Sequence, residues 1–192
     1  SAQTTLELSV HNGGNVPTEA ELVLPVPEGV VVKGFYYGDG KGKTTAAIGL
    51  GIRACGNDMK VHLVQFLKAN DSCELVTLRK IRNFSLGDAP CSLPFWFNMN
   101  ERQKSDYRRY AAQLFEAAVK TAASLDVLIL DEVLDAVNME VLPEKSLLDF
   151  LDNKPERLEV VLTGHSVAPS VEDRADYISY IKAEKHPFEH GQ

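Results

Sequence analysis

The spacing of apolar side chains changes once along the chain, near residue 30. Before that point, two stretches in which apolar and polar residues alternate flank the turn-forming segment 12–15, Asn-Gly-Gly-Asn. Such alternation on both sides of a turn predicts a β-hairpin. Two prolines then end the second stretch, because proline has no N–H to donate to a strand ladder. We therefore expect residues 1–29 to form a β-hairpin extension that serves as a lid, a dimer arm or an added sheet edge.

From residue 30 onward, short apolar runs alternate with stretches of helical periodicity. The predicted strands are 30–32 and 35–37 (broken by Lys33-Gly34), 61–66, 127–130, 160–162 and 177–181. The predicted helices cover 45–55, a long stretch from Asn100, and a stretch after Pro143 that bears Leu147, Leu148 and Leu151. The alternation predicts an α/β domain over 30–192, with a mainly parallel sheet flanked by helices.

The long helix has a recognisable start and an apolar face. Asn100 and Gln103 have the spacing of a capping box, in which each side chain binds the other residue's backbone N–H. The residues expected to face inward recur at helical spacing; they are Tyr107, Tyr110, Ala111, Leu114, Ala117, Ala118 and Thr121. The segment 127–130 is apolar throughout, as expected of a central parallel strand covered by helices.

Composition and charge restrict the function. The chain has 44% hydrophobic and 24% charged residues, no apolar run of membrane-spanning length, and no basic-then-apolar secretory signal. Its net charge of −7 argues against nucleic acid or anionic membrane as a partner, so a polyanion needs a dedicated local site. The three cysteines, Cys55, Cys73 and Cys91, fit neither metal nor disulfide spacing. They predict free thiols and a cytoplasmic location.

The segment 38–45, Gly38-Asp39-Gly40-Lys41-Gly42-Lys43-Thr44-Thr45, stands between a predicted strand and a predicted helix. Its glycines permit positive φ and close backbone approach, and the helix N-terminus attracts anions. Lys43 would neutralise phosphate charge, and the Thr44 hydroxyl could coordinate Mg²⁺. Tyr37 occupies the position of the usual first glycine, so this is a variant P-loop. The alternative, a flexible surface turn, is disfavoured by the strand–helix context.

A pair of carboxylates, Asp131-Glu132, directly follows the buried strand 127–130. In P-loop proteins an acidic residue at such a strand end holds the metal from the far side. The alternative is two charges that leave the sheet for water. Together with the segment 38–45, the pair predicts a Mg-nucleotide site and a three-layer P-loop NTPase (RecA-like) fold.

A P-loop does not by itself define the reaction. A kinase or ATPase acts at the γ-phosphorus, whereas adenosyl transfer breaks the bond at the ribose C5′ and expels the whole triphosphate. Further segments point to the second reaction by resemblance. The chain resembles the P-loop ATP:corrinoid adenosyltransferases over roughly 30–191, in the blocks 38–45 with Arg53-Ala54, 64–68 with Glu74, 129–132, 161–164 and 185–191.

The resemblance implies ATP as co-substrate, Mg²⁺ or Mn²⁺, a corrinoid substrate and a homodimer. It implies that an electron donor such as a reduced flavoprotein converts Co(II) to Co(I), which then attacks C5′. The matching nucleotide-contact residues are the P-loop together with Arg53, Gln65 and Lys68, although basic side chains near element ends usually face solvent. His165 stands where the family usually has arginine.

Phe95 and Phe97 match an aromatic pair that displaces the axial ligand of the corrinoid cobalt. The alternative is a core-packing cluster, but three consecutive aromatic residues cannot all face one core. Two other functions remain open: a P-loop kinase or ATPase, and a non-catalytic, nucleotide-gated corrinoid carrier.

Overall fold

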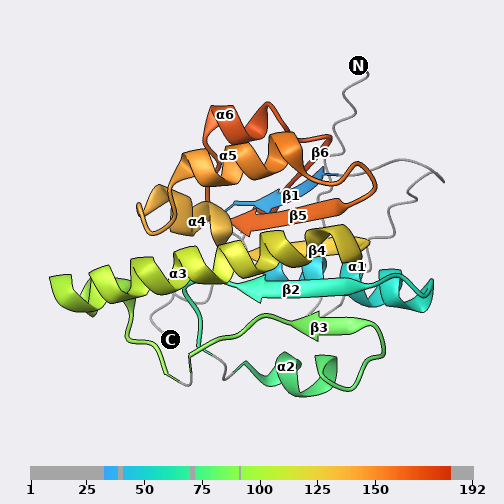
Figure 1. Ribbon diagram of the computed structural model, residues 1–192, viewed down its shortest axis with the longest axis horizontal. Coiled ribbons are helices and arrows are strands. Elements are labelled where there is room, and N and C mark those ends of the chain that lie inside the picture. The colour runs from blue at the N-terminus through green and yellow to red at the C-terminus, as the bar shows by residue number, and fades with distance from the viewer. Residues whose placement is uncertain (1–32, 39–40, 70–71, 91, 183–192) are drawn as a thin grey trace, which may run out of the picture.

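The computed structural model describes residues 33–38, 41–69, 72–90 and 92–182, so the hairpin predicted over 1–29 lies outside them (Figure 1). Six strands form one sheet in the order β3-β2-β4-β5-β1-β6, and every strand pair is parallel. The strands are β1 (Lys33–Tyr37), β2 (Val61–Gln65), β3 (Phe84–Leu86), β4 (Val127–Asp131), β5 (Glu159–Gly164) and β6 (Tyr177–Tyr180).

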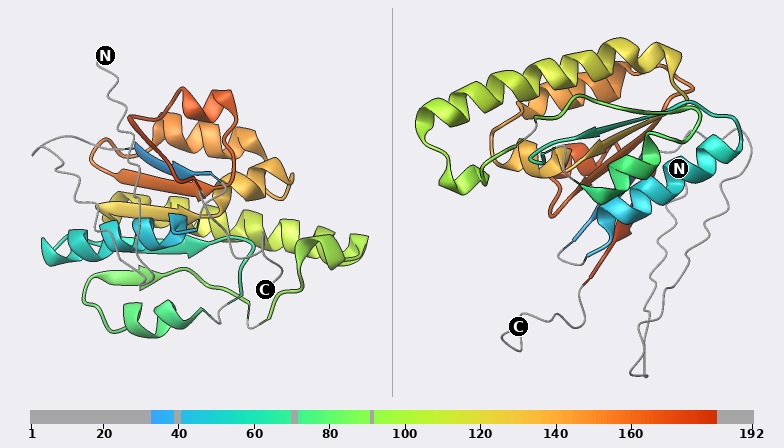
Figure 2. Two further views of the ribbon diagram at one scale, coloured as in Figure 1. Left: turned by 180° about the vertical axis from the view of Figure 1, so that it is seen from behind. Right: turned by 90° about the horizontal axis from the view of Figure 1, so that it is seen from below.

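Helices cover both faces of the sheet, which gives the three layers that the sequence predicts (Figure 2). One face carries α1 (Lys43–Gly56) and α2 (Cys73–Leu78). The other carries α3 (Glu101–Thr121), α4 (Val133–Asn138), α5 (Glu144–Asn153) and α6 (Pro169–Glu172). Two short 3₁₀ turns, η1 (Trp96–Asn98) and η2 (Ala122–Ser124), flank α3. The expected α/β fold with a parallel sheet flanked by helices is confirmed.

The core has two halves that meet at β4. Leu128 and Leu130 pack with the helices α3 to α6, whereas Val127 and Ile129 pack with α1 and α2. Every residue of β4 is buried, so the strand is covered on both faces, as its uninterrupted apolar run predicts. Its last residue, Asp131, is thereby held at the edge of a rigid core.

The capping box is confirmed. The Asn100 side chain accepts a hydrogen bond from the Gln103 backbone N–H, and the Gln103 side chain accepts one from the Asn100 N–H, both at 2.9 Å. The inward face is only partly as expected: Ala117 and Thr121 are exposed, and Phe115 is buried in their place. The apolar face therefore lies along positions 107, 111, 114, 115 and 118, the spacing that an α-helix requires.

Other boundaries also differ from the sequence prediction. Lys33-Gly34 does not break the first strand, because both residues pair in register with β5. Helix α1 begins at Lys43, two residues before the predicted start. Pro143 is the N-cap of α5 and lies outside the helix, and the short elements α2, β3, α4 and α6 were not predicted.

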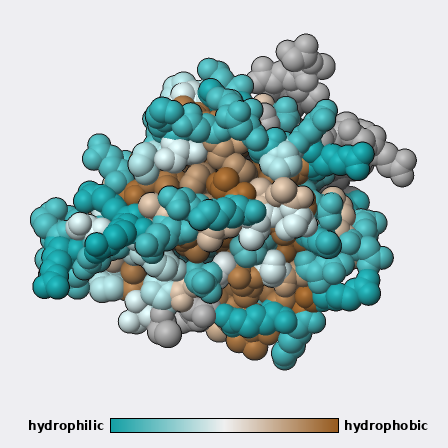
Figure 3. All heavy atoms as spheres, viewed as in Figure 1, coloured by the Kyte–Doolittle hydropathy of each residue, from teal (hydrophilic) through white to brown (hydrophobic). Residues whose placement is uncertain are grey.

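The helix layer carries an apolar groove of about 460 Å³ between α3 and α5 (Figure 3). Phe115, Val119, Leu142 and Phe150 are among its lining residues, and none of the predicted site residues lines it. In the described part of the chain, no helix has the length and apolar character to cross a bilayer. Cys55 and Cys73 are free thiols, and Cys91 lies outside the described residues.

Candidate nucleotide and metal site

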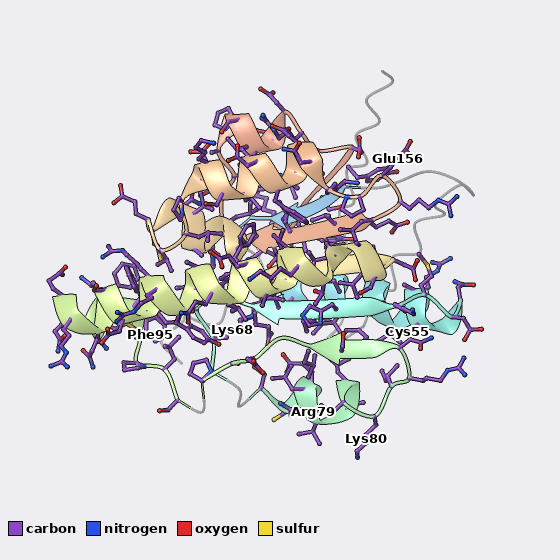
Figure 4. The ribbon with its side chains drawn as sticks, in the orientation of Figure 1. Cys55, Lys68, Arg79, Lys80, Phe95 and Glu156 are labelled. Atoms are coloured by element: carbon purple, nitrogen blue, oxygen red, sulfur yellow. The ribbon has the colours of Figure 1, made fainter. Side chains whose placement is uncertain are left out.

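The polar residues of the site stand where neighbouring parallel strands end. Gln65 at the end of β2 is in register with Asp131 at the end of β4. Thr163, near the end of β5, donates a hydrogen bond to Asp131 Oδ1 at 2.7 Å. Because parallel strands direct their carboxyl ends to one edge, residues far apart in sequence meet there. In Figure 4, Lys68 and Phe95 lie toward this same end of the sheet.

Two glycines shape the loop between β1 and α1. Gly38 has φ 129°, and a Cβ there would lie 2.3 Å from the carbonyl oxygen of Ile181. Gly42, the N-cap of α1, has φ 111°, which favours glycine. Gly42 has no side chain that could cap this end of α1, and a helix N-terminus attracts anions. Asp39 and Gly40, between these positions, lie outside the described residues.

Lys43 and Thr44 point in different directions from the first turn of α1. The Lys43 ammonium donates to the Gly38 carbonyl at 2.8 Å, so it closes over the loop itself. Thr44 donates its hydroxyl proton to Asp131 Oδ1 at 2.8 Å, across the end of the intervening strand β5. The two elements predicted to hold phosphate and metal are thus in direct contact.

Asp131 is fully buried and accepts four hydrogen bonds. Oδ1 accepts from Thr44 at 2.8 Å and from Thr163 at 2.7 Å. Oδ2 accepts from Gln65 at 3.1 Å and from Lys68 at 2.7 Å. A carboxylate has about four lone-pair sites, so this one is fully used, as a buried charge requires.

Lys68 provides the positive charge of the cluster. Its Nζ lies 2.7 Å from Asp131 Oδ2 and 3.0 Å from Glu132 Oε1, and it donates to Thr44 Oγ1 at 3.0 Å. Burial works to lower the pKa of Lys68, but the charges of Asp131 and Glu132 outweigh burial and raise that pKa above its ordinary value. The ammonium is therefore the stable form in this position.

Glu132 begins the connection from β4 to α4 in an unusual conformation, with φ 58°. Its N–H donates to Thr163 Oγ1 at 2.8 Å, which holds this turn against β5. Burial raises the pKa of Glu132, and the charge of Lys68 acts in the opposite direction. The carboxylate therefore benefits from a cation beside it.

The donor set fits a small divalent cation. One hydroxyl and two carboxylates, from Thr44, Asp131 and Glu132, surround a single point, and the Lys68 ammonium stands at that point as a cation already in place. Hard oxygen ligands suit Mg²⁺ and Mn²⁺. Among the described residues, no group of three or more His, Cys, Asp or Glu side chains could hold a metal. A cation here would therefore complete its shell with phosphate oxygens and water.

The aromatic segment before α3 divides its side chains between solvent and protein. Phe95 is 75% exposed and Phe97 is 72% exposed. Trp96, between them, packs against the core, with its ring centroid 6.2 Å from that of Tyr107 and the Arg108 guanidinium 5.3 Å from its centre. The three rings do not share one core, as expected, and two of them present apolar surface to solvent.

The remaining predicted residues are placed as follows. Arg53 is exposed in the last turn of α1, about 15 Å along the helix axis from Lys43. Lys41 and Thr45 are exposed beside the loop. The His165 backbone carbonyl accepts a hydrogen bond from the Gly38 N–H at 3.2 Å, so His165 lies next to the loop between β1 and α1. The structure brings Thr44, Gln65, Lys68, Asp131 and Glu132 together, places the Lys43 ammonium on the Gly38 carbonyl, and leaves Arg53 apart from them.

Three side chains around the site were not predicted. Thr163 connects β5 to Asp131 and to the Glu132 N–H. Asp135, buried on α4, accepts from the His165 backbone N–H at 3.0 Å and contacts His165 Nδ1 at 2.9 Å. The Tyr107 hydroxyl accepts from the Leu67 N–H at 2.7 Å. A polar residue at the end of a buried strand is a usable signal for Thr163, whereas the other two depend on how α3 and α4 pack.

Comparisons with known proteins find similarity over most of this chain. The family model described as ATP:corrinoid adenosyltransferase BtuR/CobO/CobP matches residues 29–192. The corrinoid adenosyltransferase of Escherichia coli strain K12 is 27% identical over 168 residues, which covers 85% of this chain and 81% of that protein. The corrinoid adenosyltransferase CobA of Salmonella typhimurium is 27% identical over 166 residues, with the same coverage. That of Pseudomonas aeruginosa is 28% identical over 161 residues, covering 81% and 77% of the two chains.

Proposed function

This chain belongs to the ATP:corrinoid adenosyltransferase family, and we propose that it transfers the 5′-deoxyadenosyl group of ATP to the Co(I) of a corrinoid. The observation that carries the proposal is the contact between the P-loop and the acidic strand end, through Thr44 and Asp131. Such a site binds a metal–triphosphate complex. We infer the acceptor, a corrinoid, from the family to which the chain belongs.

The proposed reaction breaks one bond and forms one. The cobalt electron pair attacks C5′ of ATP, a Co–C bond forms, and the C5′–O5′ bond breaks with its electron pair leaving on triphosphate. The leaving group gains negative charge, so positive charge around it lowers the barrier. We propose that Lys43 and the N-terminal end of α1 supply that charge; the Lys43 ammonium on the Gly38 carbonyl, beside the loop, supports this.

Thr44 and Glu132, with Asp131 behind them, would hold Mg²⁺ or Mn²⁺. When bound, the ion supplies charge neutralisation for the phosphate oxygens. Asp131 also orients the other residues, because it accepts hydrogen bonds from Thr44, Thr163 and Gln65.

Phe95 and Phe97 are proposed to cover one face of the corrinoid. Their rings are exposed, bulky and apolar, so they exclude water and offer no ligand to cobalt. Removal of an axial ligand makes Co(II) easier to reduce, and we propose a reduced flavoprotein as the electron donor. We also propose that the protein is a homodimer, as the resemblance to the family implies, and that it is cytoplasmic.

The products test this function. The protein is incubated with ATP, Mg²⁺, a strong reductant and a corrinoid, and phosphorus NMR identifies the phosphate products. Inorganic triphosphate together with a light-sensitive Co–C bond is expected. ADP and phosphate instead would show a kinase or ATPase, and tight corrinoid binding with no product would show a carrier.

A Lys43→Ala variant tests the role of the P-loop in ATP binding. A charge-assisted hydrogen bond to phosphate is worth about 1.5–3 kcal/mol, so ATP affinity should fall by at least about tenfold. Lys120→Ala removes the same charge from an exposed position on α3 and should leave ATP affinity unchanged. Equal ATP affinity in Lys43→Ala and the unmodified protein would remove the P-loop from the mechanism.

A further inference from the structure

The Lys68 ammonium occupies the position that the metal would need. Its Nζ lies 3.0 Å from Thr44 Oγ1, 2.7 Å from Asp131 Oδ2 and 3.0 Å from Glu132 Oε1. These three oxygens belong to the three side chains that form the candidate cation site. An ammonium has three N–H donors and no acceptor, so three oxygen partners satisfy it fully.

The hydrogen-bond directions show that the same oxygen lone pairs are used. Thr44 gives its only hydroxyl proton to Asp131 Oδ1, so a lone pair of Thr44 Oγ1 receives Lys68. The other acceptor positions of Asp131 are filled by Thr163 and Gln65. A cation that enters between Thr44 and Glu132 must therefore take the place of the ammonium.

We propose that Lys68 is an internal counterion, which holds the cation site in the nucleotide-free protein and is exchanged for a divalent metal when metal–nucleotide binds. The nucleotide part of this inference rests on the proposed function. The ammonium and a divalent ion cannot share the site, because two positive charges a few ångströms apart repel strongly in a partly buried environment. The lysine is thus a positioning residue for the metal ligands before the nucleotide arrives.

The local structure allows the side chain to move while the backbone stays. Leu67, the preceding residue, has φ 56°, and its N–H is bound by the buried Tyr107 hydroxyl at 2.7 Å. The Lys68 side chain is 23% exposed, so it has access to solvent on one side. A four-carbon stem can carry the ammonium a few ångströms outward, toward the negative charge of a bound triphosphate.

The exchange has a consequence for metal binding without nucleotide. In the unmodified protein, a metal ion that binds without nucleotide must displace the Lys68 ammonium. No phosphate group is then present to accept the displaced ammonium. Free Mn²⁺ should therefore bind weakly. Removal of the ammonium leaves two carboxylates and a hydroxyl without their cation, so Lys68→Met should bind free Mn²⁺ at least about tenfold more tightly.

The test measures free Mn²⁺ by electron paramagnetic resonance, with nucleotide-free protein and no corrinoid. Lys120→Met is the matched control, because it removes one exposed positive charge on α3. Its Mn²⁺ affinity should stay within about twofold of the unmodified protein. Lys68→Arg keeps the positive charge, and its Mn²⁺ affinity should remain low.

Circular dichroism establishes that each variant is folded. If Lys68→Met does not fold, Lys68→Gln serves the same test, because its amide still donates to Asp131 but carries no charge. Equal Mn²⁺ affinity in the folded Lys68 variant and the unmodified protein would overturn the counterion role. That result is independent of the product assay, which tests adenosyl transfer alone.

Discussion

Tyr107 shows how one hydroxyl on the long helix connects the core to the site. The ring is buried among the side chains between α3 and the sheet, and the hydroxyl accepts from the Leu67 N–H at 2.7 Å. Leu67 has positive φ, so this bond holds a backbone conformation that leucine rarely adopts. The bond therefore fixes the backbone from which Lys68 projects.

The raised pKa of the Tyr107 hydroxyl predicts that the protein loses stability at alkaline pH. Burial raises the pKa of Tyr107 from 10.0 to about 12, so folding favours the neutral phenol. Its contribution is complete below pH 10 and is lost as pH rises through about 12. The free energy of unfolding of the unmodified protein, minus that of Tyr107→Phe, should fall by up to about 3 kcal/mol across this window.

Urea unfolding followed by circular dichroism, at fixed pH values between 7 and 12, measures this difference. At pH 7 the variant should be less stable by about 1 kcal/mol, because the Leu67 N–H loses its acceptor. A difference that stays constant from pH 7 to 12 would show that Tyr107 does not titrate with a raised pKa.

The turn η1 and its N-cap arrange three aromatic residues. Phe95 is the N-cap, with ψ 131°, whereas Trp96 and Phe97 lie in the 3₁₀ turn, where consecutive residues are rotated by about 120° and so cannot point the same way. Trp96 is held inward by Tyr107 and Arg108, which leaves Phe95 and Phe97 outward. The segment thus presents two apolar rings to solvent while Trp96 packs against the core. Phe95 lies toward the same end of the sheet as Lys68 (Figure 4).

Replacement of both outward rings tests their proposed role. Phe95→Ala with Phe97→Ala should leave ATP affinity within about twofold, since neither residue is in the P-loop. Reduction of bound Co(II) should be suppressed, because water regains access to the cobalt. Anaerobic titration followed by the Co(II) and Co(I) absorption bands measures the effect.

A matched double variant, Ile52→Ala with Val119→Ala, removes two exposed apolar side chains from α1 and α3. It should reduce bound Co(II) like the unmodified protein. If the phenylalanine double variant also does so, these rings do not act on the cobalt.

At the scale of the whole chain, the question is where the nucleotide-binding domain begins. Its first strand begins at Lys33, and the family match begins at residue 29. Strand β1 pairs with β5 on one side and with β6 on the other. Its described hydrogen-bond partners therefore all lie within residues 33–182. We propose that residues 30–192 form the nucleotide-binding domain and that 1–29 is an extension.

Removal of residues 1–29 tests this division. The shortened chain should unfold in one cooperative thermal transition and bind ATP within about twofold of the full chain. Loss of the cooperative transition would show that the segment is part of the domain core. A fall in corrinoid affinity alone would identify the segment as a lid.

Hydrophobic periodicity and short motifs in the sequence predict much of the fold. The apolar run at 127–130, the capping box at Asn100 and the Gly-Lys-Thr segment at 42–44 each predicted their elements, because these signals are local. Strand and helix ends were less accurate. Lys33-Gly34 continues β1 because neighbouring strands supply its partners, and those partners are more than a hundred residues away in the sequence.

The candidate site divides in the same way. The sequence predicted the phosphate loop and the acidic pair 131–132 from residue type and from position along a strand–turn–helix unit, and it predicted Lys68 only through the resemblance to the family. Only the tertiary structure decided that Lys68 lies among Thr44, Asp131 and Glu132, the proposed metal ligands, that Thr163 contacts Asp131, and that Arg53 stands apart. Strand order and helix packing set these distances, and both depend on contacts between segments that no local pattern encodes.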